Sequence, residues 1–130
     1  MYKRQLLRGK NLALICESAD EADAIFFQGA ASALGAHVSH IRPSLSEPIT
    51  LAVLQETARM LGRLYHGVEC QGLPSAVVRE VGREAGIPVY DGLATGRHPI
   101  ARLAELLNGG RSDAKRRELI VQAVLVSTIG

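Results

Sequence analysis

Residues 11–34 of the chain read NLALICESADEADAIFFQGAASAL. The apolar run at 11–16 predicts a buried strand, and the apolar run that begins at Asp23 predicts a helix. A strand-to-helix junction aims backbone N–H groups and the positive end of a helix dipole at one spot, which suits an anion. Here the junction carries four carboxylates, those of Glu17, Asp20, Glu21 and Asp23. The stretch therefore predicts a βα unit whose expected anion site is acidic.

The same order of strand, short turn and helix continues along the chain. We expect strands near residues 11–16, 36–41, 66–70 and 87–90, and helices near 20–34, 48–64, 73–85 and 97–108. Glycine and proline residues occur in the connections between these elements. Short connections between alternating strands and helices are typical of parallel βα units. The sequence therefore predicts an α/β fold with three layers, in which helices flank a four-stranded parallel sheet.

A fifth helix is predicted from about residue 112 to residue 128. Its run of Leu, Ile, Val and Ala from Leu119 to Val126 is interrupted only by Gln122. A helix that is apolar on every side is buried on every side, so we expect it to pack back on the domain or to lie in an interface. The chain then divides into an α/β domain at 1–108, a glycine-rich linker at 109–111 and a C-terminal helix of the same domain at 112–130.

Composition narrows the possible functions. The 130 residues can bury one core, and 15 Lys plus Arg against 13 Asp plus Glu leave a net charge of +2, which is too balanced for a nucleic-acid partner. No apolar run reaches the about 18 residues of a membrane span, and no signal-peptide core is present, so we expect a cytoplasmic protein without membrane association. Cys16 and Cys70 lack the partners of a zinc site, and His37 and His40 lie on opposite faces of a strand. We therefore expect no metal and no cofactor.

Five segments between Leu7 and Leu107 form a recognisable series. They are LRGKNLALI at 7–15, ETARMLGR at 56–63, GIPVYDGL at 86–93, His98-Pro99, and LAELL at 103–107. In this order they resemble the carbamoyl-phosphate domain of the ornithine and aspartate carbamoyltransferases, and the ornithine branch is the more similar. Arg117 and the run AVLVSTI at 123–129 resemble the last helix of a full-length ornithine carbamoyltransferase, which folds back onto the first domain. The resemblance implies that the family's second domain, which holds the amino-acid substrate, is absent here.

Most of the family's binding residues are replaced at the matching positions of this chain. Its phosphate loop, Ser-Thr-Arg-Thr-Arg, falls on Asp20, Glu21, Ala22, Asp23 and Ala24. A family arginine after the third strand falls on Gln71, and a Gln and a Lys supplied by a neighbouring subunit fall near Glu47 and Leu51. The His-Pro-x-Gln signature keeps His98 and Pro99 but has Ala101 in place of Gln. The resemblance thus leaves His98 and Arg117 as vestigial substrate-binding residues and no catalytic residue.

Two interpretations of the acidic turn are open. Asp20 before a helix, with Asp23 three positions later, resembles a capping box that satisfies the free N–H groups at a helix start. Alternatively, Arg117 or Arg116 approaches the carboxylates, so that protein side chains fill the former anion site. In either case several carboxylates oppose a phosphate dianion, and we do not expect carbamoyl phosphate to bind there in the family's manner.

The sequence leaves three alternative functions open, each from a different functional class. The first is a degenerate, domain-deleted relative of ornithine carbamoyltransferase without carbamoyl transfer, which acts as an oligomerising or binding module. It would form a homo-trimer by family resemblance, or a dimer. The second is a carbamoyltransferase acting on carbamoyl phosphate and ornithine, with relocated anchors or a partner chain. The third is a domain that binds a small cation or amine at the acidic turn, since open α/β sheets bind ligands at the ends of their strands.

Overall fold

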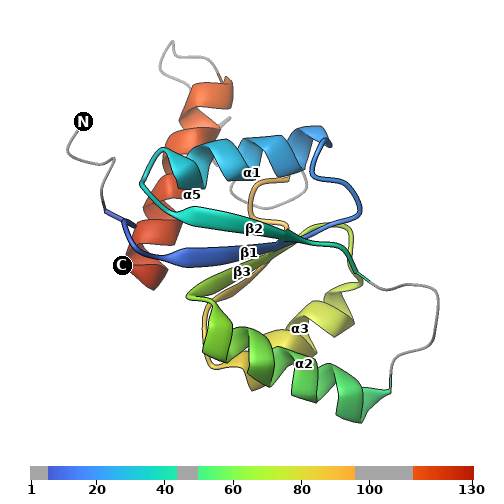
Figure 1. Cartoon of the computed structure of the whole chain (residues 1–130). Coiled ribbons are helices and arrows are strands. Elements are labelled where there is room, and N and C mark those ends of the chain that lie inside the picture. Colours follow the sequence, from blue (N-terminus) through green and yellow to red (C-terminus); the bar gives the residue numbers. More distant parts are fainter. Residues whose placement is uncertain (1–5, 44–49, 96–112) are drawn as a thin grey trace.

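The computed structural model describes residues 6–43, 50–95 and 113–130 (Figure 1). The strands are β1 (Asn11–Ile15), β2 (His37–Ile41), β3 (Gly67–Cys70) and β4 (Val89–Asp91). The helices are α1 (Ala22–Ser32), α2 (Leu51–Leu64), α3 (Ser75–Ala85) and α5 (Asp113–Ile129). The helix predicted near 97–108 and the linker predicted at 109–111 lie outside the described residues.

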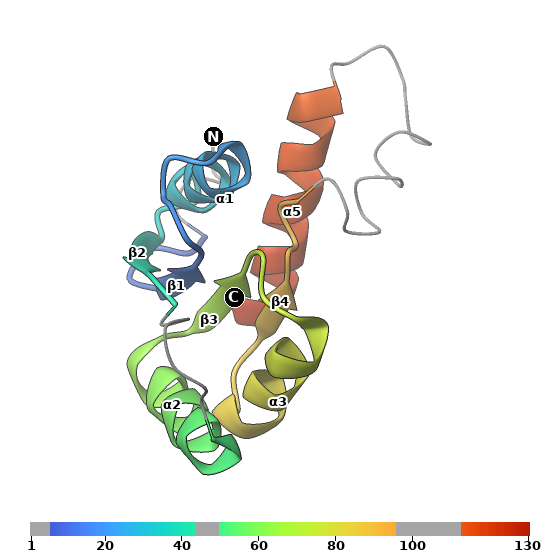
Figure 2. The same ribbon diagram turned by 90° about the vertical axis from the view of Figure 1, so that its right-hand side faces the viewer.

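The four strands form one parallel sheet in the order β2-β1-β3-β4. Helices α1 and α5 lie against one face of this sheet, and α2 and α3 lie against the other (Figures 1 and 2). The expected three-layer α/β fold is therefore confirmed. Because the strands run parallel, their carboxyl ends all open at one edge of the sheet.

Strand β1 lies in the middle of the core because helices cover both of its faces. Leu12 and Leu14 are buried in a cluster with α1 and α5, whereas Ala13 and Ile15 are buried in a second cluster with α2 and α3. Successive side chains of a strand point to opposite faces of the sheet. An uninterrupted apolar run such as that of β1 is therefore typical of a strand buried on both faces.

The start of α1 differs from the predicted one. The helix begins at Ala22, and its N-cap is Glu21, whose side chain makes no capping hydrogen bond. The expected capping box of Asp20 and Asp23 is therefore wrong. The reason is a tight turn before the helix, in which the Glu21 N–H donates to the Ser18 carbonyl (3.3 Å) and the Asp20 N–H donates to Ser18 Oγ (3.1 Å). Asp20 is thus a residue of the turn and not of the helix.

Helix α5 packs back on the domain, as expected. Val121 and Leu125 are buried with α1, and Gln122 Nε2 donates to the Ala30 carbonyl at 3.1 Å. Within this chain the helix is not buried on every side, because Ala123 is exposed and most of the other described apolar side chains are only half-buried, so full burial would need an interface with another chain. The described part of the chain places no further layer over the outer side of this helix. None of the helices in the described ranges is long and apolar enough to cross a membrane.

Candidate functional site

A pocket of about 200 Å³ lies at the carboxyl ends of the strands. Its lining consists of Glu17, Glu21, Asp23, Pro43, Gln71, Gly72, Leu73 and Thr95. These residues follow four different strands, so the sheet topology brings them together from distant parts of the sequence. Open α/β sheets bind their ligands at this edge. Three of the lining side chains are carboxylates, and none of the described lining residues is basic.

The negative charge of this pocket is compensated only weakly. Glu21 and Asp23 come from the start of α1, and Glu17 comes from the turn before it. Glu17 Oε1 lies 3.8 Å from Arg42 Nε, and both side chains are more than half exposed. An exposed ion pair of this kind contributes at most about 1 kcal/mol. The lining therefore remains dominated by negative charge.

A buried carboxylate that the sequence analysis missed lies next to the pocket. Glu69, within β3, has no exposed surface. Its Oε1 accepts a hydrogen bond from the Leu93 N–H (2.9 Å), and its Oε2 accepts from the Ala94 N–H (2.9 Å) and from Gln71 Nε2 (3.1 Å). Glu69 thereby ties the turn after β4 to β3. The signal in the sequence is an acidic residue inside an otherwise apolar strand.

Gln71 connects Glu69 to the acidic turn. Its Nε2 donates to the carbonyl of Asp23 (3.1 Å) as well as to Glu69 Oε2. An amide nitrogen has two hydrogens, so both are used inside the protein. The hydroxyl of Thr95 also donates internally, to the Gly92 carbonyl at 2.7 Å. The side-chain donors of Gln71 and Thr95 in the pocket lining are therefore engaged with the protein itself.

Arg117 of α5 has partners other than the expected ones. Its Nη2 donates to the Ala94 carbonyl (3.1 Å), and its guanidinium carbon lies 4.8 Å from the centre of the Phe26 ring. In the described ranges, no ion pair within 4.0 Å joins Arg117 to a carboxylate. The expected approach of Arg117 or Arg116 to the carboxylates of the acidic turn therefore stays a prediction, and the partners shown for Arg117 are a carbonyl oxygen and an aromatic ring. Ala94 is instead held by Glu69 at its N–H and by Arg117 at its carbonyl, and His98 lies outside the described residues.

Comparison with known proteins places this fold and pocket in context. No family model matches the chain. The ornithine carbamoyltransferase of Cutibacterium acnes is 42% identical over 105 residues, which cover 81% of this chain and 31% of that protein. The catabolic ornithine carbamoyltransferase of Haemophilus influenzae is 39% identical with the same coverage. This chain is a relative of the ornithine carbamoyltransferases. It spans about a third of the length of the curated relatives that it matches.

Solved structures of ornithine carbamoyltransferases share the fold. That of Pyrococcus furiosus matches with a TM-score of 0.64 at 25% identity and covers 79% of this chain and 33% of that chain. That of Gloeobacter violaceus matches with a TM-score of 0.59 at 30% identity and covers 78% and 32%. The resemblance inferred from the ordered segments between Leu7 and Leu107 is therefore confirmed.

Only two of the five residues that match the phosphate loop of the ornithine carbamoyltransferases line the pocket. Glu21 and Asp23 line the pocket, whereas Asp20 and Ala22 are exposed and do not line it. Ala24, in the first turn of α1, is fully buried. The pocket therefore receives two carboxylates from a loop that supplies hydroxyl and guanidinium groups in the family. Such a lining attracts cations and amines and repels anions.

Burial raises the pKa of the Glu69 carboxyl from its ordinary value of 4.5 to about 7. The three hydrogen bonds favour the charged form and nearby Asp91 disfavours it, but the loss of hydration is the largest effect. Burial likewise raises the pKa of the Cys70 thiol to about 12 and raises that of the Cys16 thiol. Both cysteines are therefore protonated and poorly nucleophilic near neutral pH. In the described ranges, no group of three His, Cys, Asp or Glu side chains could hold a metal ion.

The raised pKa of Glu69 predicts a pH dependence of stability. Between the ordinary pKa and about 7, the folded state holds a proton that the unfolded state releases. This stabilisation is complete below the ordinary pKa and is lost as the pH rises through about 7. From about pH 5 to about pH 8, we expect the free energy of unfolding to fall by about 2 kcal/mol relative to Glu69→Gln, which cannot titrate. Urea unfolding of both chains measures the difference, and a difference that is flat or rises with pH contradicts the expectation.

Proposed function

We propose that this chain is a non-catalytic relative of the ornithine carbamoyltransferases that does not bind carbamoyl phosphate and acts as an oligomerising or binding module. One observation carries the proposal. Glu17, Glu21 and Asp23 line the pocket at the edge of the sheet where α/β proteins bind their ligands. A module that keeps the fold without an anion site has a scaffold for contacts with another chain.

The balance of charge supports this proposal. A carboxylate about 7 Å from a unit negative charge opposes it by roughly 2.4 kcal/mol at an effective dielectric constant of about 20. The start of a helix favours an anion by about 0.3 to 2 kcal/mol. Three carboxylates therefore outweigh the helix terminus, even when solvent and salt screen part of the repulsion.

The loss of cationic anchors supports the same proposal. The resemblance sets Gln71 at the position of a family arginine, and both hydrogens of its amide are engaged with Asp23 and Glu69. Arg117 is engaged with Ala94 and with the ring of Phe26. The Gln71 amide therefore has no hydrogen left for a phosphate group, and one N–H and one face of the Arg117 guanidinium are already occupied within the protein.

Isothermal titration calorimetry of the whole chain tests the proposal. We expect no saturable binding of carbamoyl phosphate up to about 1 mM, because the pocket opposes the dianion. The triple variant Glu17→Gln, Glu21→Gln, Asp23→Asn removes the three charges and should bind inorganic phosphate more tightly than the wild-type chain. Glu84→Gln on α3, which does not line the pocket, is the matched control and should behave as wild type. Saturable binding of carbamoyl phosphate by the wild-type chain contradicts the proposal and favours a carbamoyltransferase that acts with a partner chain.

The same lining favours a second candidate function, the binding of a small cation or amine. Carboxylate oxygens accept hydrogen bonds from ammonium groups and attract small cations through their charge. Ornithine and Mg²⁺ are the probes in the same calorimetric experiment. Binding that is lost in the triple variant supports this candidate, and the absence of heat with both probes excludes it.

A further inference from the structure

Helix α2 exposes most of the large apolar side chains that remain uncovered. Six such side chains are exposed in the described residues, and four of them belong to α2, namely Leu51 (61%), Val53 (48%), Met60 (46%) and Leu64 (59%). The same helix buries Ala58 and Leu61 against the sheet and α3. Helix α2 therefore has a second apolar side that the described part of the chain leaves uncovered.

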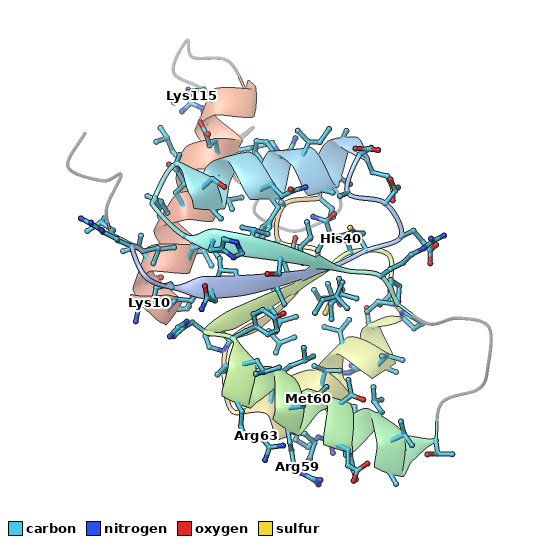
Figure 3. All side chains as sticks on the ribbon, viewed as in Figure 1. Lys10, His40, Arg59, Met60, Arg63 and Lys115 are labelled. Carbon is cyan, nitrogen blue, oxygen red and sulfur yellow. The ribbon has the colours of Figure 1, made fainter. Side chains whose placement is uncertain are left out.

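Three of these exposed positions, together with one half-buried position, follow the spacing of a helix-to-helix contact. Val53, the half-buried Thr57, Met60 and Leu64 are separated by four, three and four residues, and we call this set the α2 stripe. This spacing is that of the seam in two-stranded helical coils. A shallow hollow of about 500 Å³ lies along the stripe, between Glu56, Thr57, Arg59, Met60 and Arg63. Figure 3 shows Arg59 and Arg63 projecting from α2 away from the sheet.

Two charges of opposite sign flank the α2 stripe on the same side. Glu56 and Arg63 are seven residues apart, or about 10 Å along the helix axis. Neither side chain forms an ion pair with a described residue, whereas Arg59 is paired with Glu84 at 3.1 Å. The flank of the stripe thus carries one acidic and one basic side chain that have no ion-pair partner among the described residues.

We propose that the α2 stripe is the contact between two copies of this chain, which pack with their α2 helices antiparallel about a two-fold axis. Val53 of one copy then lies opposite Leu64 of the other, and Thr57 lies opposite Met60. Glu56 of each copy meets Arg63 of the other copy, so the surface is complementary to itself. A parallel pairing about a two-fold axis would instead place the flanks that carry Glu56 and Arg63 on opposite sides of the contact, where the two charges could not meet. This inference rests on the proposed function and names a second copy as the partner.

The size of the contact sets the strength of the dimer. Helix α2 has 14 residues, which corresponds to a length of about 20 Å. A contact made by one such helix from each copy buries less than the roughly 1,200 to 2,000 Å² of a standard interface. We therefore expect a reversible dimer that is populated at concentrations on the order of 100 μM.

Sedimentation equilibrium of the whole chain with two charge reversals tests the dimer. In Glu56→Lys, Lys faces Arg63 of the other copy, and in Arg63→Glu, two acids face each other. Each variant alone should dimerise about tenfold more weakly than the wild-type chain, because two attractive contacts become two repulsive ones. An equimolar mixture should regain wild-type affinity, because the heterodimer carries two attractive pairs. The double variant Glu56→Lys, Arg63→Glu should also regain it.

The controls separate this inference from the proposed function. Arg79→Glu makes the same charge change at an exposed position of α3 and should leave the affinity unchanged. Circular dichroism of each variant verifies the fold. A wild-type chain that stays monomeric to about 1 mM overturns the inference, as does self-association that ignores both reversals and the mixture. In the second case the chain still associates by another surface, so the proposed function stands without this contact.

Discussion

Replacing Glu69 with alanine is expected to lower the free energy of unfolding by about 4 kcal/mol at neutral pH. The substitution leaves the N–H groups of Leu93 and Ala94 and one hydrogen of the Gln71 amide without an acceptor. Each buried donor that loses its partner costs about 1 to 3 kcal/mol. Urea unfolding followed by circular dichroism measures the loss.

Two further variants sharpen the Glu69 experiment. Glu17→Ala removes an acid that is more than half exposed and should change stability by less than about 0.5 kcal/mol. Glu69→Gln keeps one acceptor oxygen, but its amide group faces N–H donors with hydrogens of its own and cannot accept from them. The stability of this variant should therefore lie between that of the alanine variant and that of the wild-type chain. A Glu69→Ala chain within about 1 kcal/mol of wild type would contradict the role of Glu69 as the tie between β3 and the turn after β4.

The substitution of Gly62 by alanine is expected to destabilise the fold by about 3 kcal/mol. A Cβ atom at Gly62 of α2 would lie 1.8 Å from the carbonyl oxygen of Ala85, so the backbones of α2 and α3 would have to separate. Both helices cover the same face of the sheet, and their separation would loosen the cluster around Ala58 and Val81. Thermal and urea unfolding measure the effect.

The matched control is the same chemical change in another helix. A Cβ atom at Gly29 of α1 meets nothing within 4 Å, and alanine is the better helix former by about 0.8 to 1.0 kcal/mol. Gly29→Ala should therefore stabilise the chain while Gly62→Ala destabilises it. Equal effects of the two substitutions would show that the close approach of α2 and α3 is not what requires glycine at position 62.

The sequence was sufficient to predict the architecture because the relevant signals are local. The apolar run of β1, the turn residues and the alternation of strand and helix each report on neighbouring residues. The parallel sheet and its helical layers follow from that alternation. The five segments between Leu7 and Leu107 indicated the family, and its members of known structure share the fold.

The site was harder to predict because its contacts join distant residues. Glu69 binds backbone N–H groups 24 and 25 positions later, and backbone groups give no signal in a sequence. Arg117 was expected to approach the carboxylates of the acidic turn, whereas the partners that the structure shows for it are a carbonyl oxygen and an aromatic ring, which a sequence does not reveal. The sequence shows the carboxylates of the turn, but it does not show which of them line the pocket. Glu21 and Asp23 line it because the helix begins at Ala22.

An amide NMR titration with carbamoyl phosphate tests most directly whether the pocket has lost its anion site. The backbone N–H signals of residues 21–24 report on the start of α1, and those of residues 71–72 report on the end of β3. At carbamoyl phosphate concentrations up to about 1 mM, we expect these signals to stay unshifted in the wild-type chain and to move in the triple variant that lacks the three carboxylates. Saturable shifts of the same signals in the wild-type chain would contradict the account.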